Sequence, residues 1–368
     1  MDLKERKILI ISSEEWDHIK LSKHHYAIEL AKKGNKVFFL EPPIREKTRY
    51  YFKEKKINEN LTIIENRFFF PYIIKFHFTP LFNFLIKFHI KSLISKYGDF
   101  DIVWSFSSLY QDLKVFNSKL IIYHLVDMPK DKIFIKGLND CDIVITVVEE
   151  IYNEINHENK LLIGHGLSNQ FLNYEAKEYN PTEKIKVGYC GNLMLKSIDR
   201  DLIIRLITIY PQIQFHFIGP YEDDKSDYIN TLKNSNNVVL HGKLVPEEIV
   251  VIYKTIDAFI ICYDKTSSFE QNRNNSSNSH KILEYLSTGK VVISTRINAY
   301  ANEQNLLEMV NDDTNEKYLD LFDQVINNLN EYNSQNKMEV RFKFAYDNSY
   351  QNKILEIEKA IFNIKTHE

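Results

Sequence analysis

Short hydrophobic runs alternate with amphipathic stretches along the first half of the chain. The stretch 21–33 has apolar residues at helical spacing and ends at Gly34. A strand-like run lies on either side of it, and this succession of strand, helix and strand is a βαβ unit. It predicts an α/β fold with a doubly wound parallel sheet. The runs that predict strands in this half are 7–12, 36–41, 61–66, 101–106, 119–125, 142–147 and 160–164.

The second half repeats the alternation of strands and helices. A polar stretch at 173–183, which contains Pro181, separates the two halves as a linker does. A chain of 368 residues is long enough for two domains of ordinary size. The runs that predict strands are 186–190, 214–218, 238–240, 257–262 and 291–293, and helices are expected at 199–209, 246–254, 317–329 and 348–364.

One short stretch of the second half combines a helix start, a helix stop and a strand. Asn278 or Ser279 can cap the helix, and Gly289 fits a left-handed C-terminal cap. Lys281 and Glu284 lie three residues apart, so both side chains project from one face. An amino group and a carboxylate at a helix N-terminus suit the diphosphate and the ribose of a nucleotide sugar. The alternative is a surface ion pair at helical spacing.

This stretch, with the sequence KILEYLSTGKVV, resembles the donor-binding helix of glycosyltransferases with two Rossmann-like domains, the GT-B fold. The resemblance implies that Glu284 binds the ribose and that Lys281 and the helix start face the diphosphate. Two residues depart from the family pattern. Ser279 stands where relatives often have Pro, and Ser276 stands where the retaining branch has the first Glu of its Glu-x7-Glu pair. The second departure favours an inverting over a retaining reaction.

The resemblance extends from Val187 to Thr295 through the motifs VGYCGNL, FHFIGPY, VVLHGKL and DAFIICY. The sequence HGLS at 165–168 resembles the turn that ends the first domain in this family, and the helix that starts near Tyr350 resembles its terminal helix. The resemblance is to bacterial enzymes of exopolysaccharide and surface-glycan synthesis. It implies two Rossmann-like, doubly wound parallel-sheet domains facing a cleft. The expected divisions are an acceptor-binding domain (1–172), a linker (173–183), a donor-binding domain (184–345) and a helix that crosses back to the first domain (346–368).

Further residues complete the candidate donor site: Gly191, Asn192, Lys196, Tyr263 and His280. Gly191 permits close approach of a diphosphate, and the turn is expected to lead into a helix whose amides favour negative charge. In relatives a basic residue often stands at the position of Lys196, and the retaining branch frequently has Arg at that of Asn192. Charge on the diphosphate would therefore be met by Lys196, Lys281 and helix amides. A Gly-Asn turn is common by itself, so its assignment depends on its neighbours.

The first half holds the candidate catalytic and acceptor residues. Glycosyl transfer with inversion needs a base to take the proton of the acceptor hydroxyl. Asp127 and His124 follow or end a strand at the carboxyl edge of the predicted sheet, where ligands bind, and Asp127 is preferred because the resembling enzymes use an acidic base in this domain. Trp16 and His24 resemble part of an acceptor-binding region. The alternatives are a packed loop aromatic for Trp16 and a hydrogen-bonded strand end for Asp127 and His124.

The segment from Arg67 to Tyr97 interleaves aromatic and aliphatic residues with lysines and contains no acid. This composition suits an anionic membrane surface, with the rings at headgroup depth and the lysines against lipid phosphates. The alternative is a buried helix with a solvated basic rim. The membrane interpretation fits an enzyme with a lipid-linked acceptor.

Composition narrows the remaining choices. A net charge of −3 gives no support for nucleic acid as a partner. Cys141, Cys190 and Cys262 lie in or beside predicted strands without paired spacing, which indicates reduced core thiols in a cytosolic protein. The start of the chain is a charged stretch followed by a short apolar run, which predicts a strand rather than a signal peptide. No apolar run approaches the ~20 residues that span a bilayer.

Two short motifs bear on metals. Asp99-Phe-Asp101 and Asp140-Cys-Asp142 match the Asp-x-Asp metal motif of the other glycosyltransferase fold, but each lies at the start of an apolar strand. We expect both to be strand-start acids and expect no metal, because lysines and helix amides can replace it.

The sequence therefore predicts a metal-independent glycosyltransferase. It would move a sugar from a nucleotide donor, UDP-linked by expectation, to a lipid-linked or growing bacterial surface polysaccharide. The expected location is the cytoplasm or the inner face of the membrane. Two alternatives stay open: a catalytically silent sugar-nucleotide-binding protein of the same fold, and a nucleotide-sugar epimerase. The sequence names neither the sugar nor the acceptor.

Overall fold

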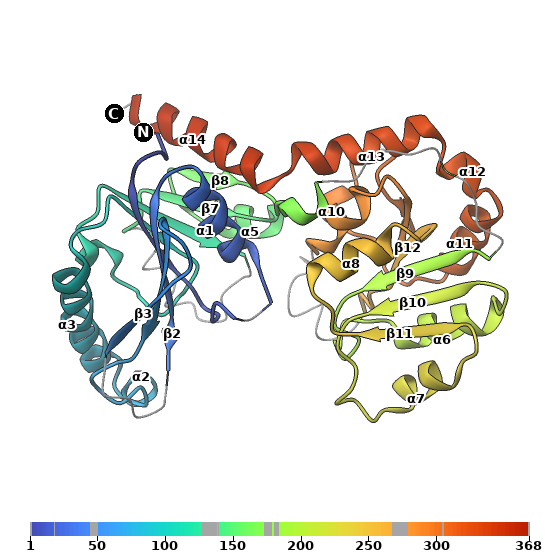
Figure 1. Ribbon diagram of the computed structural model, residues 1–368, viewed down its shortest axis with the longest axis horizontal. Coiled ribbons are helices and arrows are strands. Elements are labelled where there is room, and N and C mark those ends of the chain that lie inside the picture. Colours follow the sequence, from blue (N-terminus) through green and yellow to red (C-terminus); the bar gives the residue numbers. More distant parts are fainter. Residues whose placement is uncertain are drawn as a thin grey trace. The chain divides into compact units, whose positions relative to one another are not determined.

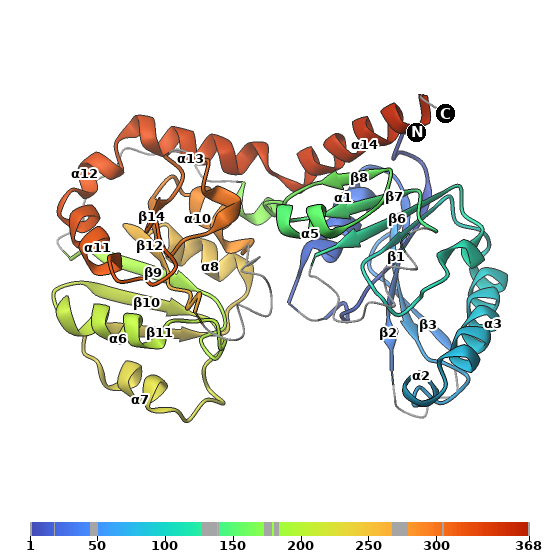
Figure 2. The same cartoon turned by 180° about the vertical axis from the view of Figure 1, so that it is seen from behind.

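The chain folds into two compact units, Met1–Gly164 with Tyr350–Glu368 as unit 1 and His165–Ser349 as unit 2. The computed structural model describes residues 2–17, 19–44, 51–126, 138, 140–172, 179, 184–266, 279–303 and 305–366. Each unit has its own sheet with helices on both faces, so the predicted α/β class with two parallel-sheet domains is confirmed (Figure 1, Figure 2).

Unit 1 contains an eight-stranded sheet in the order β3-β4-β2-β1-β5-β6-β7-β8. All its pairings are parallel except that of β3 with β4. The strands are β1 (Lys7–Ile11), β2 (Lys36–Pro43), β3 (Phe52–Lys56), β4 (Leu61–Asn66), β5 (Ile102–Ser105), β6 (Leu120–Leu125), β7 (Ile143–Thr146) and β8 (Lys160–Leu162). The sequence did not predict β3, because its residues FKEKK are charged and mostly exposed. Such composition suits an edge strand, where charge opposes pairing with another chain.

Two apolar clusters cover the two faces of this sheet. Successive residues of β1 alternate between them, since Leu9 packs in one cluster and Ile8 in the other. One cluster lies under α3 (Thr79–Tyr97), α5 (Glu149–Glu154) and the 3-10 turn η1 (Leu113–Phe116). The other lies under α1 (Ser22–Lys32) and α14 (Tyr350–Thr366), whose Ile354, Ile357 and Ile361 are buried in it. The short helix α2 (Ile74–His77) precedes α3.

Unit 2 contains a six-stranded parallel sheet in the order β11-β10-β9-β12-β13-β14. The strands are β9 (Lys186–Cys190), β10 (Gln214–Ile218), β11 (Val238–Gly242), β12 (Ala258–Ile261), β13 (Val291–Ser294) and β14 (Glu308–Met309). The helices are α6 (Arg200–Ile209), α7 (Asp227–Asn234), α8 (Pro246–Tyr253), α10 (Lys281–Leu286), α11 (Tyr318–Asn327), α12 (Leu329–Tyr332) and α13 (Gln335–Asp347), with 3-10 turns η2 (Asn169–Phe171) and η3 (Asn298–Tyr300).

The boundary between the units lies before the turn at 165–168. Leu167 forms a β-bridge with Ser349, and its amide donates to the carbonyl of Asn348 at 2.8 Å, so the turn belongs to unit 2. The sequence had placed the turn at the end of the first domain. The helix α14 belongs to unit 1. Of the predicted linker 173–183, only Tyr179 lies within the described residues.

The described part of the chain has no helix with both the length and the apolar character required to cross a membrane. All three cysteines are buried and none forms a disulfide, as predicted.

Candidate functional site

The helix α10 is fixed against the end of β9 by one side chain. The hydroxyl of Tyr285 donates to the carbonyl of Cys190 at 3.0 Å and accepts from the amide of the same residue at 2.7 Å. The ring of Tyr285 stacks on Phe259 of β12, with centroids 4.3 Å apart. The apolar side of the helix (Ile282, Leu283 and Leu286) is buried as the sequence predicted. The two strands and the helix are thereby held in one rigid arrangement.

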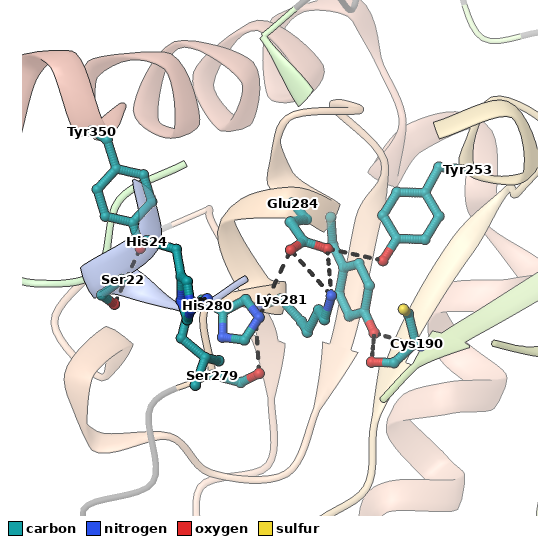
Figure 3. A network of polar contacts seen from close by, with 11 residues as sticks. Ser22, His24, Cys190, Tyr253, Ser279, His280, Lys281, Glu284 and Tyr350 are labelled. Atoms are coloured by element: carbon teal, nitrogen blue, oxygen red, sulfur yellow. Dashed lines mark hydrogen bonds and ion pairs between the residues drawn. The ribbon is translucent and has the colours of Figure 1, made fainter. Parts of the chain in front are cut away.

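Lys281 and Glu284 form an ion pair on this helix (Figure 3). The Lys281 ammonium lies 3.2 Å from Oε1 and 3.1 Å from Oε2 of Glu284. The hydroxyl of Tyr253 on α8 donates to Oε2 of Glu284 at 3.3 Å, and His280 Nε2 lies 3.9 Å from Oε1. Glu284 is buried and the side chain of Lys281 is largely so. This is therefore not the solvated surface pair that the alternative required.

Burial and charge act in opposite directions on this pair. Burial is the largest single influence on Lys281 and works against its charged form, but Glu284, Cys190 and Tyr263 together outweigh it and the pKa of Lys281 is raised. Burial likewise raises the pKa of Glu284, against the attraction of Lys281 and the hydrogen bonds from Lys281 and Tyr253. A buried ammonium and carboxylate retain unused hydrogen-bonding capacity, since a carboxylate accepts about four bonds and an ammonium donates three. They can therefore form further hydrogen bonds, the ammonium to an anion and the carboxylate to hydroxyl groups.

The turns that follow β9 and β10 are in such close contact that only glycine fits at Gly219. A Cβ on Gly219, whose φ is +140°, would lie 1.9 Å from the carbonyl oxygen of Gly191, and one on Gly191 would lie 2.7 Å from the hydroxyl of Tyr189. The Asn192 side chain is used locally, because its Oδ1 accepts from the amide of Met194 at 2.9 Å. The turn is thus narrow and held within the sheet edge.

The turn is followed by the expected helix, but only after a loop. The helix α6 begins only at Arg200, and the carboxylate of Asp199 caps it by accepting from the amide of Leu202 at 2.9 Å. A carboxylate at that place repels a diphosphate and occupies the donor amide. Lys196 lies in the exposed loop between Gly191 and α6. The helix α10 has only six residues, and its N-cap position is His280. The predicted cap residue Ser279 lies one position earlier, and its Oγ accepts from the amide of Lys281 at 3.3 Å.

Tyr263 connects the Lys196 loop to the rest of the site. It forms an isolated β-bridge with Ile198, and its amide donates to Thr295 Oγ1 at 3.2 Å. It is also near enough to Lys281 to raise the pKa of that residue. Unit 2 therefore gathers the candidate donor residues of β9, β12 and α10 at the carboxyl edge of one sheet, which is where open α/β sheets bind ligands.

The proposed acceptor residues of unit 1 are packed. Trp16 is buried with its ring against Phe39 (centroids 5.0 Å apart), and its amide donates to Glu41 Oε1 at 2.6 Å. His24 is wholly buried: Nδ1 accepts from the amide of Leu21 at 3.0 Å and Nε2 lies 3.0 Å from the carbonyl of Glu15. Burial lowers the pKa of His24 to about 4. These rings hold the loop after β1 in place, which is the alternative stated for Trp16. Both ring nitrogens of His24 are used within the protein.

The two base candidates differ in what the structure describes. Asp127 lies outside the described residues. His124 is buried beside Phe106, with ring centroids 4.6 Å apart, and lies near Tyr26 and Trp104 as well. A ring enclosed by aromatic side chains is badly placed to take a proton from a sugar hydroxyl, so burial argues against His124 in that role.

The two Asp-x-Asp motifs are strand-start acids, as expected. Asp101 accepts from the amide of Lys7 at 3.0 Å and pairs with Lys119, and Asp142 accepts from the amide of Ile121 at 2.6 Å. The hydrogen bond from Lys119, with that from Lys7, holds the pKa of Asp101 below its usual value. Within the described ranges, His, Cys, Asp and Glu side chains form no group of three suited to a metal ion.

Tyr253 and Tyr285 were not predicted from the sequence as residues of the site. Tyr285 directly follows Glu284 in the motif, and this position could have indicated that it belongs to the site. Tyr253 lies about thirty residues upstream on another helix, and only the folded chain brings it to Glu284.

No protein-family model and no curated protein sequence matches the chain. Solved structures do resemble it. The sucrose-phosphate synthase of Thermosynechococcus elongatus superposes with a TM-score of 0.70 at 14% identity, covering 99% of this chain and 100% of that one. Anabaena Alr3699/HepE in complex with UDP and glucose gives 0.65 at 12% identity, over 98% and 99% of the two chains. An α,α-trehalose-phosphate synthase (UDP-forming) from Burkholderia vietnamiensis gives 0.68 at 10% identity, over 98% and 97%.

The chain has the GT-B fold. At these identities the likeness concerns the architecture, and it covers nearly the full length of both chains. The resemblance stated from the motif at Lys281–Leu286 is therefore confirmed for the fold.

Proposed function

We propose that this protein is a glycosyltransferase that takes a sugar from a UDP-linked donor. The observation that carries the proposal is the buried pair of Lys281 and Glu284, held by Tyr253 at the carboxyl edge of the unit 2 sheet. The GT-B fold supports it, because HepE was solved with UDP and the Burkholderia synthase is described as UDP-forming.

The donor would engage residues that the site already orients. Glu284 has unused acceptor capacity for ribose hydroxyls, and Lys281 has a third N–H for a diphosphate oxygen. Gly191, without a side chain at the end of β9, would let the diphosphate approach the backbone. As the glycosidic bond breaks, negative charge builds on the leaving UDP, and Lys281 with Lys196 would stabilise it without a metal.

The transfer step is proposed from the sequence. Asp127 of unit 1 would take the proton of the acceptor hydroxyl while that oxygen attacks the anomeric carbon and UDP leaves. Ser276, in place of a Glu of the retaining branch, supports inversion. The acceptor is proposed to be a lipid-linked or growing surface polysaccharide, which the exposed aromatic side chains of α2 and α3 support over a free sugar.

The test is the release of nucleotide from a panel of UDP-, GDP- and TDP-sugars, with and without glycan acceptors. We expect acceptor-dependent release of UDP from at least one UDP-sugar. Binding of UDP without any turnover would instead identify the silent sugar-nucleotide-binding protein, and conversion of a UDP-sugar without an acceptor would identify the epimerase. Absence of UDP binding would remove the donor-site assignment itself.

A further inference from the structure

The helices α2 and α3 carry apolar side chains on their outer side as well as their inner side. Along α3, the buried residues that pack on the sheet are Phe82, Ile86, His89, Ile90 and Leu93. Leu81, Phe84 and Phe88 point away from them and are exposed, and α2 has no buried residue at all. A helix that only covers a core is polar on its outer side, so packing within unit 1 does not account for these residues.

The exposed rings belong to α2, α3 and the residue between them, and the two helices contact each other. Phe76, Phe78 and Phe84 are 67%, 58% and 57% exposed, and Phe88 is 50% exposed. Phe84 and Phe88 touch edge to face with ring centroids 5.0 Å apart. We call Phe76, Phe78, Phe84 and Phe88 the aromatic face. Several large apolar side chains exposed on two neighbouring helices mark an interaction site.

A pocket of about 490 Å³ opens beside the aromatic face. It is lined by Ile44, Phe69, Pro71, Tyr72, Ile73 and Phe76, among others. Its walls begin where β2 and β4 end, at Pro43 and Asn66, so the pocket lies at the carboxyl edge of the unit 1 sheet. Figure 1 shows α2 near the ends of β2 and β3, with α3 along the flank of the sheet.

The charges around this surface have one sign. From Arg67 to Tyr97 the chain has no Asp or Glu. Two of its lysines are neutralised from outside the segment, Lys87 by Asp112 at 2.8 Å and Lys96 by Glu54 at 3.6 Å. Lys75 and Lys91 form no ion pair with any residue that the structure describes. Exposed apolar side chains beside unneutralised lysines are complementary to a lipid layer, which is apolar inside and can be anionic at its surface.

We propose that the aromatic face, with Lys75 and Lys91, docks on an anionic lipid bilayer. The rings would lie at headgroup depth, where aromatic side chains are favoured, and the two ammonium groups would meet lipid phosphates. A second copy of the chain fits less well, because a two-fold interface would bring the same cations against each other. The protein would bind at the bilayer surface, and this proposal does not depend on the proposed glycosyl transfer.

The test is co-sedimentation with vesicles of phosphatidylcholine alone or mixed with phosphatidylglycerol, at low and high salt. The full chain is expected to bind the mixed vesicles, to bind neutral vesicles more weakly, and to lose binding as salt rises. The affinity of the variant Phe76→Ser/Phe84→Ser/Phe88→Ser for the mixed vesicles should be lower by about tenfold or more. Phe362→Ser, which removes an equally exposed ring from α14, is the matched control and should bind as the unaltered chain does.

A second variant separates charge from folding. Lys75→Glu/Lys91→Glu leaves every ring in place and should also lower binding to the mixed vesicles about tenfold, with Lys359→Glu on α14 as the control. Thermal melts of all variants should coincide, because none of the altered side chains is buried. No binding of the unaltered chain to anionic vesicles overturns the proposal. So does a chain that is dimeric in solution and becomes monomeric in the ring variant, since that result assigns the face to a second copy.

Discussion

The hydroxyl of Tyr285 makes two hydrogen bonds to one residue, donating to the carbonyl of Cys190 and accepting from its amide. Cys190 is the last residue of β9, and the turn with Gly191 follows it directly. Tyr285 stands next to Glu284 in α10. One side chain therefore sets the distance between the two parts of the candidate donor site.

Replacing Tyr285 with Phe should loosen that connection while the stacking on Phe259 remains. Two buried backbone groups lose their partner, and each costs about 1 kcal/mol or more. We expect the free energy of unfolding in urea to fall by about 2–3 kcal/mol and UDP to bind more weakly. Tyr51→Phe, which alters an exposed ring in unit 1, should leave both unchanged. Unchanged UDP affinity in a clearly destabilised Tyr285→Phe protein would confine this contact to folding.

Lys281 and Glu284 should contribute to binding and to stability in separable ways. Glu284→Gln leaves the buried ammonium of Lys281 without its counter-charge, which costs about 3–5 kcal/mol. It should also abolish the stabilisation by UDP, which is about 2.7 kcal/mol at a concentration one hundred times the dissociation constant. The double variant Lys281→Met/Glu284→Leu buries no charge, so its stability should recover while the effect of UDP stays absent. The measurement is thermal unfolding with and without UDP.

The ion pair of Lys32 and Glu29 provides a control with the same spacing. Its Lys32 partner is exposed, and such pairs contribute about 0–1 kcal/mol. Lys32→Ala should therefore change stability little and leave the UDP effect intact. If UDP still stabilises Glu284→Gln as strongly as it stabilises the unaltered chain, the donor site lies elsewhere.

Local signals predicted α10, the helix of the candidate donor site, whereas the features that were not predicted depend on contacts between residues far apart in the sequence. Ser279, Lys281, Glu284 and Gly289 lie within a few turns of one another, so spacing and cap residues were enough. His24 carried a polar side chain on a helix near the expected ligand edge, but burial between Glu15 and Leu21 turned it inward. Sequence spacing does not report whether a histidine is enclosed. For the same reason the capping of α6 by Asp199 was not foreseen as an obstacle to phosphate.

The buried histidines should make the fold sensitive to acid. Burial lowers the pKa of His24, His89 and His216 to about 4 each, against an ordinary value of 6.5. As pH falls below about 6.5, these histidines therefore bind protons in the unfolded chain but not in the folded chain. The free energy of unfolding decreases until pH reaches about 4. The expected slope is up to about 1.4 kcal/mol per pH unit for each such ring.

Urea denaturation across this pH range measures that slope. His89 lies 2.8 Å from Asn66 Oδ1 in the core of unit 1, and His89→Gln should make the decline shallower by one ring's share. His77→Gln, which removes an exposed ring on α2, serves as the control. A decline of equal steepness in the His89 variant would show that this ring takes up its proton without unfolding.

Replacement of Asp127 should lower transfer activity, whereas replacement of His124 should mainly alter stability. Asp127→Asn is expected to keep the UDP-dependent thermal shift and to lose transfer by about 100-fold or more, because general base catalysis contributes that much. His124→Phe should mainly alter stability, since the ring is enclosed by Tyr26, Trp104 and Phe106. Turnover numbers corrected for the folded fraction make the comparison. Unchanged transfer in Asp127→Asn would remove Asp127 from the role of base.

Arg341 should prove necessary for the position of α10 although it is far along the chain from the motif. It is wholly buried on α13, and its Nη1 donates to the carbonyls of Gly289 at 3.2 Å and Tyr332 at 2.7 Å. Burial lowers its pKa to about 10, against the attraction of Glu308 at 3.8 Å. Arg341→Met leaves both carbonyls unpaired and should cost about 3 kcal/mol in urea.

The control is Arg296→Met, because Arg296 also donates to a backbone carbonyl, that of Asn311 at 2.7 Å, but is exposed. Water replaces the lost donor there, so we expect a change within about 0.5 kcal/mol. Gly289 is the left-handed cap of α10, with φ of +75°, so release of its carbonyl in Arg341→Met should also weaken UDP binding. Equal stability of the two variants would mean that the buried guanidinium does not hold the end of this helix.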